Sequence, residues 1–298
     1  QLAFPIIFDM EMEKFDFVLV DEAQDLSPVQ IELTKRALKD SGRAIYCGDR
    51  KQAIYQFRGA DSAAMQKIES DLECAILPLS ICYRCGTNIV DLAKEIVPQI
   101  EAAPGASSGT VETIYNDEFD PIEGDMIVCR TTAPLVENCL RLIREGKTAT
   151  VKGRDIGKSI EVLIKKARCK RSESIDLFLS AMEGYYEKEH SKLSRTRREQ
   201  ALQTLEDKYD TILALSDHDT CETVGDILDT IERLFSDDAR GITFSTVHKA
   251  KGLEAETVYI LRPDLMPHPK AKDLDAELNI RYVAITRAKQ RLVTVLPD

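Results

Sequence analysis

Short apolar runs alternate with longer segments of mixed polarity in the first half of the chain. Phe15–Val20 is a β-branched and aromatic run that ends at an acidic pair, a pattern that predicts a strand. Ser27 and Pro28 follow, and a serine N-cap with proline at the first helical position predicts a helix from there to residue 38. A second strand is expected at 43–47. Strands that alternate with helices predict a parallel α/β sheet, whose ligands bind at the carboxyl ends of its strands.

The same alternation returns later, on either side of a long helical stretch. Further strands are expected at 111–115, 125–129, 148–151, 241–245, 257–261 and 291–296, with helices at 92–100 and 133–145. From about residue 158 to residue 238 the pattern becomes long, charged and helical, as in Ile175–Tyr186 and Glu199–Leu215. We interpret this stretch as a helical insertion in the α/β pattern.

Composition and charge are those of a soluble globular protein. The 298 residues include 40 basic and 51 acidic side chains, a net charge of -11 and 43% hydrophobic residues, as in a soluble globular protein of about two domains. An acidic total does not exclude a local basic groove. No apolar run approaches the roughly 20 residues that span a membrane. The amino terminus has neither a signal-peptide pattern nor an initiator methionine, so we expect a partial chain. Eight irregularly spaced cysteines indicate reduced thiols and a cytoplasmic protein.

Asp21 and Glu22 directly follow the first expected strand. A nucleotide hydrolase places there one carboxylate that holds Mg²⁺ and a second that orients or deprotonates water. The alternative is that these acids are solvated at a strand end and that Asp25 only opens the helix. The pair on its own leaves both interpretations open.

Residues 48–60 follow the second expected strand and combine a glycine turn, an amide, two aromatic rings and three cations. Rings beside cations suit stacking on the bases of a single strand while the cations hold phosphates. Alternatively, Tyr55 and Phe57 belong to the core and Gly48 is a simple turn. The position of the loop, one strand after the acid pair, favours the functional interpretation.

These two segments and three later ones resemble the motifs of UvrD/Rep-type superfamily 1 DNA helicases. Asp21–Asp25 and Gly48–Ala60 resemble motifs II and III, Leu79–Arg84 motif IV, Thr243–Glu254 motif V and Arg281–Lys289 motif VI. The five occur in the order of the family and extend over nearly the whole chain apart from the helical stretch. The resemblance implies two RecA-like domains with nucleotide between them, and ATP and Mg²⁺ as cofactors.

The resemblance also implies roles for residues of the first domain. Asp21 would bind Mg²⁺, and Glu22 would act as general base on the attacking water, as a carboxylate beside a metal can. Gln52 would sense the γ-phosphate and connect it to the DNA contacts of its own loop.

Residues of the second domain would complete the nucleotide site. By resemblance, Tyr83 would stack on adenine and Glu254 would bind the ribose. Arg84 and Arg287 would reach the γ-phosphate and stabilise charge on the transferring oxygens. The alternative for both arginines is an ordinary surface salt bridge.

The DNA contacts implied by the resemblance lie in motifs III and V. Tyr55 and Phe57 would stack on bases, with Arg58 beside them, and His248 would lie near DNA. The family often has tryptophan at the second stacking position, so Phe57 offers a smaller ring face.

Cys82 and Cys85 bracket the Tyr-Arg pair of motif IV. Two thiolates at that spacing form half of a tetrahedral zinc site. No second close pair of cysteine or histidine follows at finger-like spacing. We favour thiols packed in the core over a metal site.

ATP hydrolysis of this type requires a phosphate loop, G-x-x-x-x-G-K-[ST], whose backbone donors and lysine cradle the phosphates. None precedes Asp21, so we expect a helicase cut inside its first domain. The segment from Gly153 to Ser159 imitates the loop, but three residues instead of four separate Gly153 from Gly157. We interpret it as a connector into the helical stretch, with a true phosphate loop as the alternative.

The helical stretch carries clusters of basic residues. They comprise Lys165, Lys166, Arg168, Lys170 and Arg171, and later Arg195, Arg197 and Arg198. Such clusters can hold DNA phosphates, but acidic residues lie between them, and a solvated helix face is an equal alternative.

The sequence therefore predicts an α/β fold of RecA-like parallel sheets, of the P-loop NTPase type. The expected parts are the end of a first RecA-like domain (1–75), a second RecA-like domain (76–157 and 239–298) and a helical insertion between its halves (158–238). The expected function is an ATP-dependent helicase or translocase on single-stranded or partly duplex DNA, with 3′ to 5′ polarity by resemblance, no membrane partner and a missing amino-terminal part. The competing function is a non-catalytic protein that binds DNA or a partner.

Overall fold

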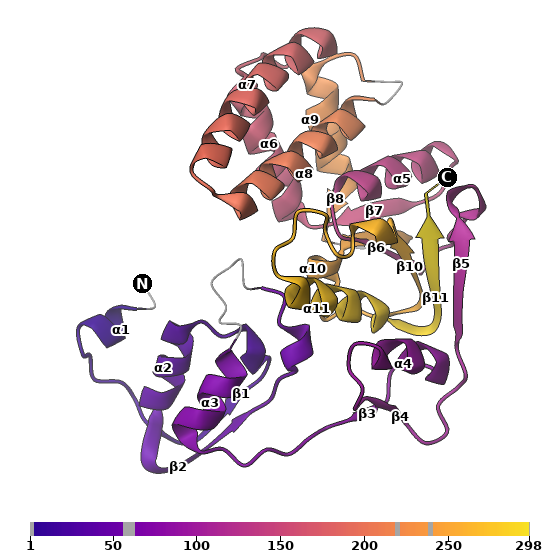
Figure 1. Ribbon diagram of the computed structural model, residues 1–298. Helices are drawn as coiled ribbons and strands as arrows, with labels where there is room; N and C mark the ends of the chain where they lie inside the picture. Colours follow the sequence, from indigo (N-terminus) through magenta and orange to yellow (C-terminus); the bar gives the residue numbers. More distant parts are fainter. Residues whose placement is uncertain (1–2, 56–62, 218–220, 238–240, 298) are drawn as a thin grey trace.

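The computed structural model describes residues 3–55, 63–217, 221–237 and 241–297. Its centre is a sheet of seven parallel strands in the order β5-β11-β10-β6-β9-β7-β8 (Figure 1). The strands are β5 (Thr110–Tyr115), β6 (Met126–Cys129), β7 (Ala149–Lys152), β8 (Phe235–Ser236), β9 (Ile242–Thr246), β10 (Ala255–Leu261) and β11 (Ala288–Leu296). This mixed α/β architecture confirms the predicted fold class and is consistent with a RecA-like sheet.

Helices cover both faces of the sheet. They are α4 (Thr87–Lys94), α5 (Ala133–Arg144), α10 (Val247–Ala250) and α11 (Leu274–Ile285). In β6, Ile127 packs into a core with α5, whereas Val128 packs into a second core with α4 and α11. Every residue of β6 is buried, as is typical of a central parallel strand whose apolar run faces helices on both sides.

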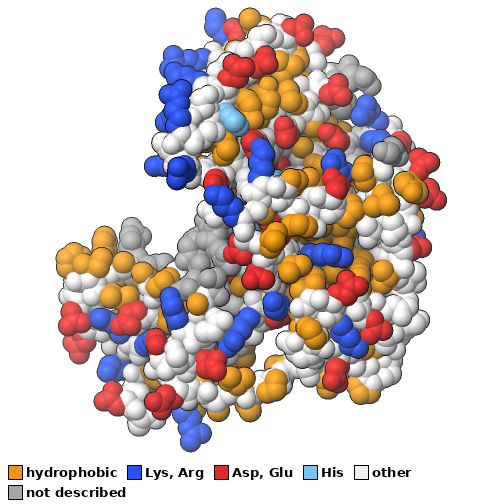
Figure 2. All heavy atoms as spheres, viewed as in Figure 1, with side chains coloured by type: hydrophobic (Ala, Val, Ile, Leu, Met, Phe, Trp, Pro, Cys, Tyr) orange, Lys and Arg blue, Asp and Glu red, His pale blue; other side chains and the backbone are white. Residues whose placement is uncertain are grey.

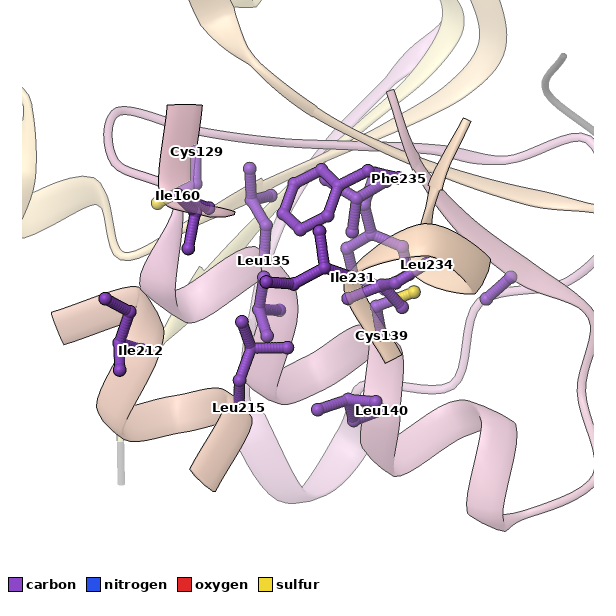
Figure 3. Packing of buried hydrophobic residues seen from close by; sticks show 14 of the residues in the cluster. Cys129, Leu135, Cys139, Leu140, Ile160, Ile212, Leu215, Ile231, Leu234 and Phe235 are labelled. Atoms are coloured by element: carbon purple, nitrogen blue, oxygen red, sulfur yellow. The ribbon is translucent and has the colours of Figure 1, made fainter. Parts of the chain in front are cut away.

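Helices α6 to α9 form a layer beyond the β7 and β8 edge of the sheet (Figure 1). They are α6 (Arg154–Ile164), α7 (Ile175–Arg195), α8 (Glu199–Ser216) and α9 (Val224–Leu234). Their apolar faces extend the α5 core, where Ile160, Ile212 and Ile231 join Leu135 (Figure 3). Within the described ranges, no helix has both the length and the apolar character needed to cross a bilayer.

A half-buried carboxylate on α8, that of Asp207, holds the start of α5. Thr132, the residue before α5, donates its backbone N–H to Asp207 Oδ1 at 2.6 Å and its hydroxyl to Oδ2 at 2.9 Å. Burial raises the pKa of Asp207, although the hydrogen bonds from Thr132 and the charge of Arg130 act in the opposite direction. The first amides of a helix have no acceptor within the helix. Asp207, from the helical layer, is the acceptor for the amide that precedes α5.

The amino-terminal part is a smaller unit that lies beside α10 and α11 (Figure 1). It contains α1 (Phe4–Ile7), β1 (Phe15–Val20), α2 (Pro28–Arg36), β2 (Leu38–Tyr46) and α3 (Ala64–Leu72). β1 and β2 are parallel, with Val20 opposite Tyr46, so the loops after both strands leave the same edge. The extended chain after α3 leads to a second parallel pair, β3 (Ile81–Cys82) and β4 (Glu101–Ala102).

Local sequence signals predict many of these boundaries correctly. β1 has the predicted limits, and Ser27 caps α2 through a capping box with Gln30. The prediction of a helix at 92–100 is wrong, because α4 begins after Gly86 and ends at Lys94, before a proline at 98 that a continuing helix could not accommodate. The short strands β3, β4 and β8 were not predicted, since two residues carry no periodic pattern.

We expect Asp207→Ala to lower the free energy of unfolding by about 1–3 kcal/mol, because the N–H and hydroxyl of the buried Thr132 would both lose their acceptor. Urea unfolding followed by circular dichroism measures the change. Asp210→Ala is the control, since Asp210 lies on the same helix and burial raises its pKa too, without the bonds to Thr132. An equal decrease in the free energy of unfolding in both variants would contradict the stabilisation of α5 by Asp207.

Candidate functional site

Asp21 and Glu22 leave the carboxyl end of β1 in a strained turn. Glu22 has φ 53° and ψ 38°, in the left-handed region. That region costs a non-glycine residue about 1–2 kcal/mol. Asp21 Oδ1 accepts the Glu22 N–H at 2.9 Å, and both residues are exposed. Since such strain clusters at functional sites, the turn marks these carboxylates as a candidate site.

Gln24 connects this turn to the loop after β2. Its side chain is 2% exposed, its Nε2 donates to Glu22 Oε2 at 2.6 Å, and its Oε1 accepts the Asp49 N–H at 3.1 Å. A Cβ on Gly48 would lie 2.5 Å from Gln24 Oε1, so only glycine permits this approach. The Gly48 turn is therefore part of the site architecture.

Lys251 brings the segment after β9 into contact with both loops. Its Nζ lies 3.0 Å from Glu22 Oε2, 2.5 Å from Asp25 Oδ2 and 3.0 Å from the carbonyl oxygen of Gln52. The Gln52 side chain itself turns to its own loop, where Nε2 donates to Asp49 Oδ2 at 3.0 Å. The structure thus places Glu22 and Gln52 around one cation.

The two acids of this cluster titrate in opposite directions. Burial raises the pKa of Glu22, but the hydrogen bond and charge of Lys251, the Gln24 hydrogen bond and the Arg287 charge outweigh it, so the pKa is lowered. Burial dominates at Asp25 and raises its pKa despite Lys251, with the charge of Glu22 adding to the rise. Glu22 is therefore a carboxylate at neutral pH.

Tyr55 joins the same cluster from the end of the 48–55 loop. Its hydroxyl donates to the carbonyl oxygen of His248 at 2.7 Å, and the two rings lie 6.4 Å apart at 46°. Lys251 Nζ lies 5.3 Å from the centre of the Tyr55 ring, within the range of a cation–π contact. The two residues predicted to contact DNA in motifs III and V are therefore neighbours.

Arg84 and Glu254 pair directly with each other. Arg84 Nε lies 2.5 Å from Glu254 Oε2, and Lys289 Nζ lies 2.8 Å from Glu254 Oε1. The hydrogen bonds from Lys289 and then Arg84 hold the pKa of Glu254 below its usual value. The predicted roles of Arg84 on phosphate and Glu254 on ribose stay predictions. In this structure the two side chains form an ion pair with each other.

Arg287 is enclosed by its own segment and by the motif V segment. It is 1% exposed, with Nε donating to the Val283 carbonyl at 2.9 Å, Nη1 to the Leu253 carbonyl at 3.1 Å and Nη2 to Thr286 Oγ1 at 3.1 Å. Burial lowers its pKa, and the neighbouring charge of Arg84 lowers it further. Its electrostatic interaction with Glu22 places it on the acid-pair side of the site.

The remaining predicted residues lie apart from this cluster or outside the described residues. Tyr83 is 81% exposed on the segment between β3 and α4. Phe57 and Arg58 lie outside the described residues. The structure therefore brings together Asp21, Glu22, Gln52, Tyr55 and His248, with Arg287 close to Glu22.

The chemistry of the site fits Mg²⁺ bound together with phosphate. In the described part of the chain, no three histidine, cysteine or acidic side chains gather into a set able to hold a metal ion. Mg²⁺ keeps several waters and binds through one or two carboxylates plus substrate phosphates, so it does not need an all-protein cage. The exposed carboxylate of Asp21 suits that mode of binding.

Cys85 belongs to the core formed with α4 and α11, and Cys82 packs against that core. Cys85 is 3% exposed, and its Sγ lies 3.8 Å from the Thr286 carbonyl oxygen. A hydrogen bond from Cys85 is the main cause that lowers the pKa of Cys82 to about 5, and the same bond raises that of Cys85. These contacts are those of thiols packed at the edge of a core, the interpretation that the sequence favours.

The segment from Gly153 to Ser159 runs from β7 directly into α6. Gly153 precedes the helix with φ 123°, and its carbonyl accepts the N–H groups of Ile156 and Gly157. Gly157 is buried inside α6, where a Cβ would lie 3.0 Å from the Cβ of Phe235. Because these amides serve the helix, the geometry favours the connector over a phosphate loop.

The sequence alone does not predict a role for three residues that connect Glu22, Asp25 and Gln52. Gln24, Asp49 and Lys251 lie inside the motif segments but were given no function, because their partners come from other loops. In the sequence, the available signals were a glutamine two residues after the acid pair and a lysine next to glycine.

Comparisons with known proteins agree with these motifs. Residues 4–73 match the UvrD/REP helicase N-terminal domain, and residues 241–295 match the UvrD-like helicase C-terminal domain. The arterivirus nonstructural protein 10 helicase is 16% identical over 93% of this chain and 38% of that chain, with a TM-score of 0.40. That TM-score is too low to bear on the function.

Several relatives are named as DNA helicases. F-box DNA helicase protein 1 of Schizosaccharomyces pombe is 26% identical over 97% of this chain and 34% of its own. DNA helicase II of Haemophilus influenzae is 32% identical and PcrA, an ATP-dependent DNA helicase of Bacillus subtilis, 30%, each over 31% of this chain and 13% of its own. The chain thus spans about a third or less of the length of these relatives. The two domain matches and the named relatives show that this chain is similar to UvrD-like DNA helicases over these segments.

Proposed function

We propose that the chain carries motifs II to VI of an ATP-dependent helicase or translocase that acts on single-stranded or partly duplex DNA. The observation that carries the proposal is the convergence of motifs II, III and V on one cluster. Lys251 bonds Asp25 across 226 residues of sequence, beside Glu22 and Gln52. A general base, a phosphate sensor and a base-stacking ring within one cluster are the parts that a DNA-driven ATPase needs.

Each residue has a defined task in this mechanism. Asp21 would hold Mg²⁺ with the ATP phosphates, which supplies charge neutralisation for phosphoryl transfer. Glu22, ionised at neutral pH, accepts a proton from the attacking water. Gln52 contacts the γ-phosphate region, and Arg84 and Arg287 bring positive charge from the second domain. Tyr83 and Glu254 take the adenine and the ribose.

The exposed face of β1 and β2 supports the fragment interpretation. Phe17, Leu19 and Ile45 are 67%, 72% and 55% exposed. Parallel strands are almost always covered on both faces, so we propose that further strands and helices of a RecA-like domain, with the phosphate loop, pack here. Figure 2 shows other apolar side chains gathered on the same unit, near α1. Domain limits of 1–75, 76–157 with 239–298, and 158–238 fit this proposal.

A cavity lies beside motif V. It has a volume of about 760 Å³ and lies between α6, α8, α10 and α11. Its wall includes His248 and five basic residues, Arg130, Lys208, Lys249, Lys270 and Lys272, together with five acids, Asp155, Glu199, Asp207, Asp273 and Glu277. Arg130, Lys249 and Lys272 pair with three of those acids, so the wall is of mixed charge and does not by itself favour DNA. We propose 3′ to 5′ movement from the family resemblance alone.

We expect DNA-stimulated phosphate release from Mg²⁺-ATP by the protein that includes this sequence together with a phosphate loop. Glu22→Gln should lower the rate at least about 100-fold, because the general base is lost while the amide keeps the shape. The comparison is made with and without single-stranded DNA. An unchanged rate in Glu22→Gln would remove the assigned role. Absence of turnover, with DNA binding kept, would favour the non-catalytic alternative.

We expect Tyr55→Ala to weaken binding of a fluorescent oligothymidylate by about 1–3 kcal/mol, since the stacking ring is removed. Tyr55→Phe should bind close to the parent, because it keeps the ring while losing the bond to the His248 carbonyl. Tyr115→Ala is the control, an exposed tyrosine at the end of β5. Fluorescence anisotropy over a salt series measures all four proteins, and equal affinity of Tyr55→Ala and Tyr115→Ala would rule out stacking by Tyr55.

A further inference from the structure

Cys82 and Cys85 lie in contact with each other where the second part of the chain begins. Cys82 ends β3, and Cys85 immediately precedes Gly86, the N-cap of α4. A hydrogen bond joins the two thiols. Among the described residues, no third histidine, cysteine or acidic side chain completes a set that could hold a metal ion with them. The pair is therefore best described as a dithiol.

Backbone hydrogen bonds fix both ends of the segment that contains the pair. The Cys82 carbonyl accepts the Ala103 N–H at 3.1 Å, and the Gly86 N–H donates to the Lys289 carbonyl at 2.8 Å. A disulfide needs two sulfurs about 2 Å apart. Because the two thiols are already in hydrogen-bond contact, rotation of their side chains brings the sulfurs closer while the fixed ends stay in place.

The two thiols differ in exposure and in charge. Cys85 is 3% exposed, whereas Cys82 is partly exposed. The hydrogen bond from Cys85 is the main cause that lowers the pKa of Cys82 to about 5, and the charge of Arg84 adds to it. Burial instead raises the pKa of Cys139 and Cys221. Cys82 is therefore a thiolate at neutral pH, which is the nucleophilic form of cysteine.

We propose that Cys82 and Cys85 are a redox-active dithiol that exchanges with low-molecular-weight disulfides of the glutathione type and closes to an intramolecular disulfide. Cys82 is the attacking thiol, and Cys85 is the resolving thiol. The ring that closes contains Tyr83 and Arg84, two residues proposed above to contact nucleotide. The dithiol chemistry itself does not depend on the proposed function.

The exchange takes place in two steps. The Cys82 thiolate attacks one sulfur of oxidised glutathione, which forms a mixed disulfide and releases one glutathione thiolate. Cys85 then gives its proton to solvent, and its sulfur attacks Cys82 Sγ, which forms the intramolecular disulfide and releases the second glutathione thiolate. The two cysteine thiols lose two electrons and two protons in total. One glutathione disulfide gains them and becomes two thiols.

The loss of charge at Cys82 in the first step favours the second. The hydrogen bond to Cys82 is the main cause that raises the pKa of Cys85, and the charge of Cys82 adds to it. Both causes disappear in the mixed disulfide, where burial still opposes the Cys85 thiolate and the charges of Arg84 and Arg287 favour it. A stabilised Cys82 thiolate also favours the reduced pair, so we expect reduced glutathione to reopen the disulfide.

The test exposes the folded protein to oxidised glutathione, digests it with trypsin without reduction and identifies the products by mass spectrometry. Trypsin cleaves after Arg84, so an intramolecular disulfide appears as two peptides joined through Cys82 and Cys85. We expect the joined peptides in the parent and their loss after addition of reduced glutathione. Cys47, an exposed thiol after β2, is the internal control and should form a mixed disulfide. A Cys47 adduct without the joined peptides would overturn the proposal.

Two variants assign the order of attack. Cys85→Ser should stop at a glutathione adduct on Cys82, and Cys82→Ser should leave Cys85 unmodified. Cys169→Ser is the matched control, because Cys169 is also a partly exposed thiol, with its Sγ 3.7 Å from the Ala167 carbonyl oxygen, and this variant should form the joined peptides as the parent does. Modification of Cys85 in Cys82→Ser as fast as that of Cys82 in Cys85→Ser would overturn the assigned order.

A measurement on the parent protects the test against a loss of folding in the variants. Brief alkylation of the reduced parent with iodoacetamide should modify Cys82 before Cys85, because Cys82 is both more exposed and ionised. Circular dichroism checks that each variant is folded. Alkylation of Cys85 before Cys82 in the parent would contradict the role of Cys82 as the attacking thiol.

Discussion

Parallel strands place all of their carboxyl ends at one edge, and the candidate site depends on that constraint. Asp21 follows β1, Gly48 follows the end of β2, and α10 follows β9. Val20 pairs with Tyr46, so the loops after β1 and β2 begin side by side at one edge of the sheet. Gln24 can therefore bond Glu22 in the first loop and Asp49 in the second. Residues far apart in sequence therefore meet without long connecting loops, and the sheet fixes their spacing.

The contact between the amino-terminal part and the second part is mainly polar. Asn279 on α11 donates to the carbonyl oxygens of Arg50 and Ala53, and Tyr55 and Lys251 add the bonds described above. Ile54 is the buried apolar residue of the 48–55 loop that joins the core of the second part. Polar contacts of this kind are typical of interfaces between domains of one chain.

Much of the fold and part of the site could be predicted from the sequence, because their signals are local. The strand at Phe15–Val20, the cap at Ser27 and the acid pair after β1 depend on neighbouring residues alone. The contacts of Lys251 and Asp207 depend on residues from other elements, and no period in the sequence encodes them. Periodicity also does not show whether an arginine is enclosed, as Arg287 is, or whether a ring is exposed, as Tyr83 is.

The left-handed backbone of Glu22 lowers the stability of the fold at a position that carries a candidate catalytic carboxylate. Glycine adopts this conformation without strain, so replacing Glu22 by glycine would relax the turn while removing the carboxylate. Selection for stability alone would therefore favour loss of the acid. The glutamate at this position therefore carries a backbone strain that glycine would not carry.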